Sequence, residues 1–151
     1  MKRIALTLLA IILALSCILG IAGCEKNENE TTAETLAEGE EIEATGLWAN
    51  ATYRSNVTLG KGAKTVSFTV EAEGKMITVN LKTDKPTLGE AMYEHELIND
   101  PSFFDTLNGI LASWAQNQAY WAFYEGDIMM PYGVNDQNID GGEAYRFVYT
   151  K

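Results

Sequence analysis

Several residue types are scarce in this chain of 151 residues, and each shortage excludes a class of site. It has two cysteines, of which Cys17 lies within an apolar N-terminal run and Cys24 directly follows that run. If the apolar run is removed with Cys17, Cys24 is the only cysteine left, and the remaining chain can form no internal disulfide and no cysteine-based metal site. The only histidine, His95, excludes a zinc site built from several histidines, and we expect it to be a solvated residue near the end of a short helix.

Positive charge is scarce as well. The chain carries 11 Lys and Arg against 21 Asp and Glu, a formal net charge of −10. No basic stripe interrupts this acidity, and an acidic surface repels phosphate backbones. Nucleic acid is therefore not expected as a partner.

The N-terminus has the pattern of a secretory signal peptide. Lys2 and Arg3 precede an almost uninterrupted apolar stretch over residues 4–22. It ends in Ile21-Ala22-Gly23-Cys24, which resembles the lipobox of bacterial lipoproteins. The resemblance implies cleavage after residues 1–23, a diacylglycerol thioether on Cys24, and an extracytoplasmic protein that is lipid-anchored to the bacterial cell membrane. An uncleaved transmembrane helix is the alternative, because the run is near the length that spans a bilayer.

Residues 24–44 are predicted to be an acidic, flexible tether. Lys26 is the only basic side chain of this segment, and large apolar residues are almost absent. Such a segment cannot bury enough surface to offset its ordering entropy, and its like charges extend it. We expect a spacer between the membrane and the following domain; its glutamates are Glu25, Glu28, Glu30, Glu34, Glu38, Glu40, Glu41 and Glu43.

Residues 45–151 are expected to form one domain with one hydrophobic core. Residues 47–57 mix aromatic and polar side chains and are predicted to be a strand-like arm leading to a turn at 59–62. Period-two alternation predicts strands over 65–71 and 76–82, which a turn at Glu73-Gly74 joins into a hairpin.

One helix and further strands follow the hairpin. Thr87-Leu88-Gly89-Glu90 is a capping-box pattern that opens a short helix, and Asn99-Asp100-Pro101 ends it. This order indicates an α+β fold, with a small grasp-like, mainly antiparallel sheet and the helix on one of its faces. The remaining predicted elements are strands over 103–107 and 110–115 joined by the type I′ turn signal Asn108-Gly109, a turn at 116–118, and strands over 119–124 and 144–150.

Short motifs over residues 46–151 resemble a known family. They include Ala119-Tyr120-Trp121-Ala122-Phe123-Tyr124, Tyr132-Gly133-Val134, and Tyr145-Arg146-Phe147-Val148-Tyr149-Thr150. In this order and spacing they resemble a bacterial lipoprotein domain of unknown function that is similar to the C-terminal domain of transcobalamin and intrinsic factor. The resemblance implies a grasp-like fold and a non-covalently bound corrinoid, which is cobalamin-like, as the candidate ligand.

The resemblance also nominates site residues. It implies that Tyr120, Trp121 and Phe123 on one strand, with Tyr132 and Gly133 on a loop, face the ligand. In the animal proteins a large helical barrel completes the site, and this sequence encodes none. A partner, a second copy or a transporter component would have to supply a second wall.

The aromatic strand 119–124 leaves two alternatives open. Both of its faces carry aromatic side chains, so one face packs on the core while the other exposes a patch of the kind that often marks a binding site. A loop or the arm around Trp48 could instead cover that second face. The rival function is a surface interaction or adhesion module for a protein or glycan, in which the strand 145–150 offers an edge to a partner strand.

A weak metal pattern supports a third function, a calcium-stabilised structural domain. Asp136, Asn138 and Asp140 place oxygen ligands at alternate positions and Gly141 at the sixth, as in the first half of a calcium loop. Phe147 stands where that loop requires a bidentate glutamate, so no metal site is predicted.

Enzymatic activity is not expected. Nucleophilic catalysis needs a serine, cysteine or lysine activated by a neighbouring base, and no serine lies in a glycine-flanked elbow. The leading prediction is a membrane-anchored lipoprotein with a non-catalytic ligand-binding domain that captures a corrinoid for uptake.

Overall fold

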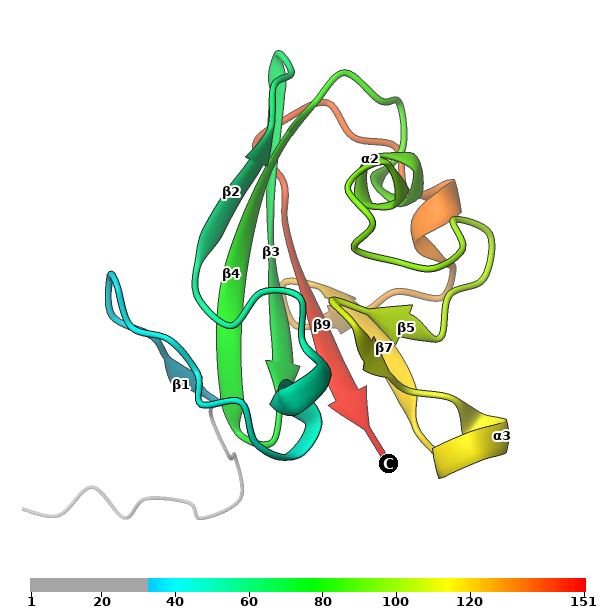
Figure 1. Cartoon of the computed structure of the whole chain (residues 1–151). Coiled ribbons are helices and arrows are strands. Elements are labelled where there is room, and N and C mark those ends of the chain that lie inside the picture. The colour runs from blue at the N-terminus through cyan, green and yellow to red at the C-terminus, as the bar shows by residue number, and fades with distance from the viewer. Residues whose placement is uncertain (1–32) are drawn as a thin grey trace, which may run out of the picture. The chain divides into compact units, whose positions relative to one another are not determined.

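The computed structural model describes residues 33–151. The predicted signal peptide 1–23, the lipidation site Cys24 and the first part of the tether lie outside the described residues. The α+β class is confirmed, since a curled, mixed sheet makes up most of the domain and α2 lies over one of its faces (Figure 1). The elements are β1 (Glu34–Thr35), η1 (Gly46–Asn50), β2 (Val57–Gly60), β3 (Lys64–Ala72), β4 (Lys75–Thr83), α2 (Leu88–Glu94), β5 (Thr106–Leu107), β6 (Ile110–Leu111), α3 (Trp114–Asn117), β7 (Tyr120–Glu125), β8 (Ile128–Met129), η2 (Val134–Asp136) and β9 (Ala144–Thr150).

The hairpin β3–β4 forms as the alternation predicts. The two strands pair antiparallel over nine residues each, and every second side chain is buried. Glu73 and Gly74 make the turn with positive φ angles of 54° and 71°. The inner face of the hairpin carries Val66, Phe68, Val70, Ile77, Val79 and Leu81, which are at most 1% exposed.

The last strand, β9, lies in the middle of the sheet. It runs parallel to β3 over residues 144–148 and antiparallel to β7 over residues 145–150. The strand order is β1-β4-β3-β9-β7-β8, with β2 beside β4. The prediction that residues 145–150 offer a free edge is therefore wrong, because the chain crosses over between β4 and β9 and inserts β9 next to β3.

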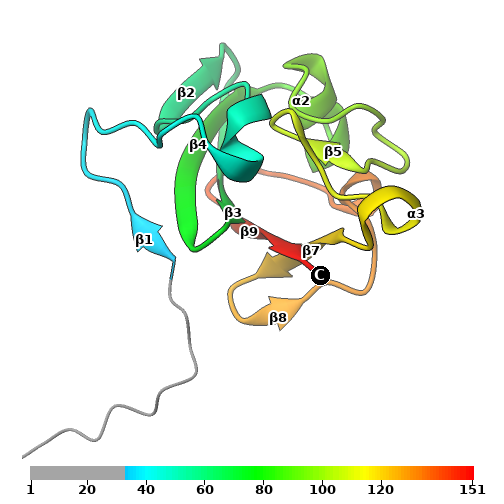
Figure 2. The same cartoon turned by 60° about the horizontal axis from the view of Figure 1, so that its bottom comes forward.

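Helix α2 begins as its capping pattern predicts. The Thr87 hydroxyl accepts a hydrogen bond from the Glu90 backbone N–H at 3.3 Å. Leu88, Ala91 and Met92 point into the core and are fully buried. Figures 1 and 2 show the helix over the same side of the sheet as β5, so this side holds the core.

Two predicted strands are shorter than expected. Of 103–107 and 110–115, only β5 and β6 remain, joined by a turn in which Asn108 and Gly109 have φ angles of 52° and 78°. The helical turn α3 replaces the end of the second strand and the start of the predicted turn at 116–118. Asn117 explains the change, because its side chain accepts from Ser113 N–H and donates to the Leu111 carbonyl, which competes with strand pairing.

The arm before β2 also differs from the prediction. Residues 46–50 form the 3₁₀ turn η1, and Trp48 is 1% exposed with its indole N–H donating to the Ala72 carbonyl at 3.0 Å. The predicted turn at 59–62 begins within a strand, since β2 pairs parallel with β4 as far as Gly60. Trp48 in this arm thus covers the core at the end where the β3–β4 turn lies.

Ordered structure extends to the N-terminal side of Thr45. Strand β1 pairs with β4, and Ile42 is 3% exposed and packs into the core. The Ile42 N–H donates to the Arg54 carbonyl at 2.7 Å, and the Arg54 guanidinium pairs with Glu41. The part of the predicted tether from residue 33 onward therefore lies on the domain, because its few apolar side chains find places in the core. Among the described residues, no helix is long and apolar enough to cross a membrane.

Candidate functional site

The inner face of β7 and β9 is an aromatic core. Phe123 stacks on Phe147 with ring centroids 5.0 Å apart and an interplanar angle of 8°, and its ring lies 5.5 Å from Tyr145. Phe147 in turn makes an edge contact with Phe68 at 5.6 Å. Phe123 is 7% exposed, so this predicted site residue is part of the core.

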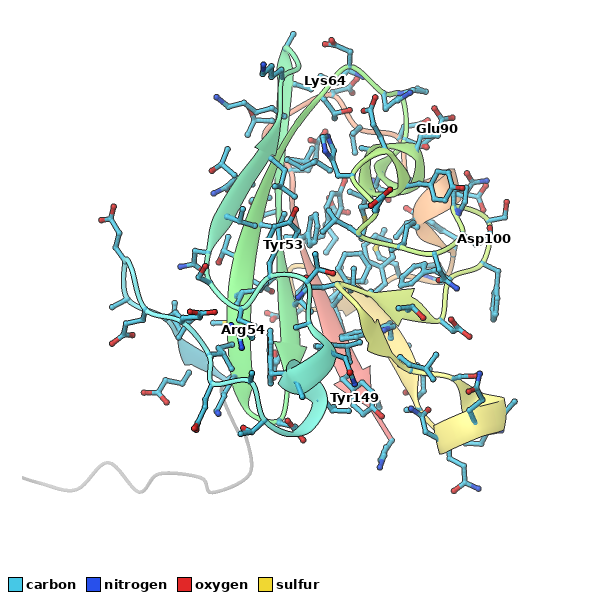
Figure 3. All side chains as sticks on the ribbon, viewed as in Figure 1. Tyr53, Arg54, Lys64, Glu90, Asp100 and Tyr149 are labelled. Carbon is cyan, nitrogen blue, oxygen red and sulfur yellow. The ribbon has the colours of Figure 1, made fainter. Side chains whose placement is uncertain are left out.

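Trp121 occupies the same face nearer the start of β7. It is half-buried, packs against the core and meets the Tyr149 ring edge-on at 5.7 Å. Its indole N–H is buried and has no hydrogen-bond partner among the described residues. Figure 3 shows Tyr149 at the end of β9. Trp121 and Tyr149 thus form a half-exposed aromatic pair at one end of the domain.

Tyr120 and Tyr124 point to the opposite, outer face. Tyr120 is 41% exposed, and Tyr124 lies under the Arg146 guanidinium at 4.6 Å from the ring centroid. Arg146 also approaches the Glu71 carboxylate at 3.7 Å. Trp48, which could have covered this face, packs into the inner core instead. The outer face of β7 therefore keeps an exposed tyrosine.

Tyr132 and Gly133 lie on the loop between β8 and η2, and both are exposed. Burial of Tyr145 disfavours its phenolate and raises its pKa to about 12, and Tyr132 adds a small contribution in the same direction. Gln137 donates to the Tyr145 oxygen at 2.9 Å. Tyr145 begins β9 and Tyr149 nearly ends it, so the loop and the Trp121–Tyr149 pair lie toward different ends of that strand. The five predicted residues do not converge on one site.

The candidate metal ligands Asp136, Asn138 and Asp140 are all exposed. Residues 33–151 contain no group of three His, Cys, Asp or Glu side chains that could hold a metal ion. The Glu143 carboxylate instead accepts the backbone N–H groups of Asp140 and Gly141, at 2.6 and 2.8 Å. Desolvation raises the pKa of Glu143, but these donors and nearby Lys64 outweigh it, and the pKa lies below its ordinary value.

Exposed large apolar side chains are concentrated in one part of the sequence. All seven within the described residues fall between residues 93 and 132. Their concentration makes the segment 93–132 the candidate source of an interaction surface. They are Tyr93, Phe103, Trp114, Tyr120, Ile128, Met129 and Tyr132.

A concave site that the sequence did not suggest lies at the other end of the sheet. A pocket of about 700 Å³ is bounded by the ends of β2 and β4 and by the end of α2. Its lining includes Lys61, Lys82 and Lys85 together with His95, which is half-buried and not the solvated residue expected from the sequence. The signal in the sequence was the clustering of lysines over residues 61–85 in an otherwise acidic chain.

Comparisons with known proteins support the fold. No protein-family model matches the sequence, and a comparison with curated proteins finds no match. Among solved structures, a protein from Ruminococcus gnavus ATCC 29149, provisionally described as metal-binding, has a TM-score of 0.53 and 19% identity over 58% of this chain and 97% of its own. Haptocorrin in complex with Cbi has a TM-score of 0.44 and 13% identity over 62% of this chain, which spans 26% of haptocorrin. The first similarity shows a shared fold, and the second is too low to carry an inference.

Proposed function

We propose that this chain is an extracytoplasmic lipoprotein, anchored through Cys24, whose domain binds a ligand non-covalently at its aromatic end. We define the aromatic end as Trp114, Tyr120, Trp121 and Tyr149. Figures 1 and 2 show α3, the start of β7 and the C-terminus of β9 together in this part of the domain. The anchor rests on the lipobox resemblance at residues 21–24.

The exposure of the aromatic end is the observation that carries the proposal. Trp114 is 70% exposed and Tyr120 is 41% exposed, although each could have been buried as core. Aromatic side chains offer a large apolar contact area with a polar tip, which suits a planar macrocycle or a sugar ring. Exposed apolar groups that gather on one surface mark interaction sites.

A corrinoid is the leading ligand in this proposal. It is supported by the sequence resemblance to the transcobalamin-type domain and by the aromatic surface. An open surface buries one side of such a ligand, so a partner subunit, a second copy or a transporter component supplies the other side. Trp121 and Tyr149 are then contact residues on one face, Tyr120 lies on the opposite face at the start of the same strand, and Phe123 belongs to the aromatic core.

Titration of the soluble domain tests this proposal. Residues 25–151 contain the whole described body with its own core, and they are titrated with cobalamin and with cobinamide. Because corrinoids absorb light where tryptophan emits, fluorescence quenching counts only where the calorimetric heat saturates at the same ligand concentration. No heat at high micromolar ligand would refute the corrinoid assignment.

Two conservative variants locate the ligand. Trp114→Phe and Trp121→Phe each remove one emitter and keep an aromatic ring. We expect saturable quenching to decrease in the variant that lacks the tryptophan nearest to the ligand. Trp48, which is 1% exposed, remains in both variants as a buried emitter. Quenching that survives unchanged in both variants would place the ligand away from the aromatic end.

A surface interaction module is the second candidate, and the outer edge of β7 favours it. Strand β8 pairs only with Tyr124 and Glu125, and Met130 N–H reaches the Phe123 carbonyl at 2.8 Å. By the alternation of antiparallel pairing, the N–H and C=O of Trp121 face outward beyond β8, where a partner strand could add. Hydrogen exchange tests it: the Trp121 amide becomes protected when a partner protein adds a strand, and stays fast when a small ligand or glycan binds.

Metal binding is not proposed for this chain. The R. gnavus protein shares the fold, but Glu143 here is committed to the turn at Asp140 and Gly141. A calcium-stabilised domain would require the free oxygens of Asp136, Asn138 and Asp140 to gather around one ion. Thermal unfolding with and without EDTA would reveal such an ion as a change in midpoint.

A further inference from the structure

The charges of the domain are unevenly distributed. Residues 33–151 carry 18 Asp and Glu against 8 Lys and Arg. Five of the six lysines in this range lie between residues 61 and 85, and all of these except Lys75 belong to the end of the hairpin where Lys64 pairs with Thr83. Figure 3 shows Lys64 at the end of the sheet opposite to Tyr149. The acidic domain therefore has one basic end, away from the aromatic end.

The basic end is hollow. Its pocket of about 700 Å³ lies between the end of β2, the end of β4 and the end of α2. Lys61, Lys82 and Lys85 line it together with His95 and two acidic residues, Asp84 and Glu94. Three parts of the chain thus contribute three lysines and one histidine to the lining of one concave site.

Gly60 lets the histidine approach the sheet. Its φ angle is +80°, and a Cβ there would come within 2.1 Å of the Lys82 carbonyl oxygen and 2.8 Å of His95 Nε2. Any other residue at this position would collide with the neighbouring strand and with the imidazole. The glycine therefore places the His95 ring against the β2–β4 edge of the pocket.

The hydrogen bonds that hold the pocket wall do not involve the ammonium groups of Lys61 and Lys82. Thr83 is buried and its hydroxyl accepts from Lys85 N–H at 3.0 Å, while Asp84 accepts from Ala63 N–H at 2.9 Å. The Lys64 ammonium is also occupied, since it donates to the carbonyls of Lys85 and Ile139 at 3.1 and 2.8 Å. These bonds fix the loop between β4 and α2.

Two lysines have no anionic partner in the described part of the chain. The Lys85 ammonium is 3.6 Å from the Glu94 carboxylate, so these two charges offset each other. Lys61 and Lys82 form no ion pair there, and His95 makes no side-chain hydrogen bond there. Two ammonium groups and an imidazole are left to bind an anion from solution.

We propose that this pocket binds a phosphate group. A phosphate monoester carries about −1.5 to −2 charges at pH 7, which the two ammonium groups without an ion-pair partner can balance. Hydrogen bonds from ammonium groups to phosphate are the strong, charge-assisted kind. The phosphate belongs to a soluble ligand or to a lipid headgroup, since both present the same chemistry. The inference does not rest on the proposed function, because the two sites share no residue.

The sole histidine gives a direct readout. In the untagged soluble protein, residues 25–151, the ring protons of His95 produce one set of NMR signals. We expect them to shift saturably with inorganic phosphate at constant pH and ionic strength. A shift no larger than that produced by sodium chloride would overturn the proposal for soluble phosphate.

Charge-matched variants separate the pocket from the overall charge. Lys61→Gln/Lys82→Gln removes two positive charges from the pocket, and Lys75→Gln/Lys151→Gln removes two elsewhere. We expect phosphate affinity to fall about tenfold or more in the first variant and to change little in the second. Equal losses in both variants would overturn the site. Lys61 and Lys82 are exposed, so equal thermal midpoints should verify that the variants fold.

Vesicle flotation distinguishes the source of the phosphate. Phosphatidylglycerol vesicles that float the wild type and the control variant, but not Lys61→Gln/Lys82→Gln, assign the pocket to a lipid headgroup. Phosphatidylcholine vesicles serve as the neutral control. Phosphate-dependent His95 shifts without flotation assign it to a soluble ligand. The absence of both flotation and a phosphate-dependent His95 shift would refute the phosphate site.

Discussion

The hairpin β3–β4 and the segment 93–132 use their apolar side chains in opposite ways. On the hairpin, strict alternation places Val66, Phe68 and Val70 inside, and no large apolar side chain of residues 64–83 is exposed. In the segment 93–132, seven large apolar side chains are exposed, among them Phe103 at 83%. The hairpin places its apolar side chains in the core, whereas the later segment supplies core residues and also the exposed apolar side chains.

The difference shows how one small domain divides stability from recognition. Burial of apolar area stabilises the fold wherever the hairpin alternates. Exposed apolar groups contribute little to folding and remain available for contacts with other molecules. Phe123 on β7 shows both uses within the later segment, because it is buried in the core while Tyr120 on the same strand is exposed.

Paired phenylalanine substitutions give the largest test of this division. Phe68→Ala leaves a cavity beside Phe147 and should lower the free energy of unfolding by about 3–5 kcal/mol. Phe103→Ala removes an exposed ring and should change it by less than about 0.5 kcal/mol. Urea unfolding followed by tryptophan fluorescence measures both. A comparable loss for Phe103→Ala would break the comparison, because that ring would then be part of the core.

The hairpin and α2 could be predicted because their signals are local. Alternation of apolar residues sets both strands, and Thr87 with Glu90, three positions later, marks the start of the helix. The Asn108-Gly109 turn likewise needs only its own two residues to adopt positive φ. The same reasoning applies to the α+β class, which follows from the order of these elements.

Features that depend on long-range contacts could not be predicted. The central place of β9 follows from its parallel pairing with β3, some 75 residues earlier in the chain. The faces of β7 were ambiguous because Tyr120, Trp121 and Phe123 are all strand-forming aromatics, and only the register with β9 assigns Tyr120 to the outside. The basic pocket needs β2, β4 and α2 to meet, and no local pattern encodes that meeting.

Two tryptophan substitutions sharpen the comparison at the level of single hydrogen bonds. Trp48→Phe removes the indole N–H that donates to the Ala72 carbonyl and leaves that buried oxygen unpaired, so the free energy of unfolding should fall by about 1–2 kcal/mol. Trp121→Phe removes a buried N–H that has no partner in the described residues, and it should cost distinctly less. Thermal and urea unfolding of both variants provide the measurement. A larger cost for Trp121→Phe would indicate an acceptor that only the full-length chain supplies.

A substitution of Glu143 tests the loop that directly precedes β9, where this strand begins to pair with β3 of the hairpin. Its carboxylate accepts backbone N–H bonds from Asp140 and Gly141, and its own carbonyl accepts from Ser67 N–H on β3. Since the pKa of Glu143 is lowered in the folded state, its contribution is present above the ordinary value of 4.5 and disappears as pH falls through the folded-state pKa. Glu143→Gln should therefore cost about 1 kcal/mol at pH 7, discounted for solvent, and nothing in strong acid. Urea midpoints of both proteins across this pH range measure the difference, and a constant difference would contradict the assignment.

The substitution of Ile128 should have the smallest effect on stability and a clear effect on the hydrophobicity of the surface. Ile128 on β8 is 71% exposed, so Ile128→Ser should change the free energy of unfolding by less than about 0.5 kcal/mol. The same substitution should shorten retention on a hydrophobic-interaction column, because that side chain belongs to the exposed apolar set. Thr58→Ser, an exposed position on β2, is the control and should leave retention nearly unchanged. If Ile128→Ser destabilises the domain but leaves retention unchanged, its side chain acts as core, and the division between a stabilising hairpin and a binding segment does not hold at β8.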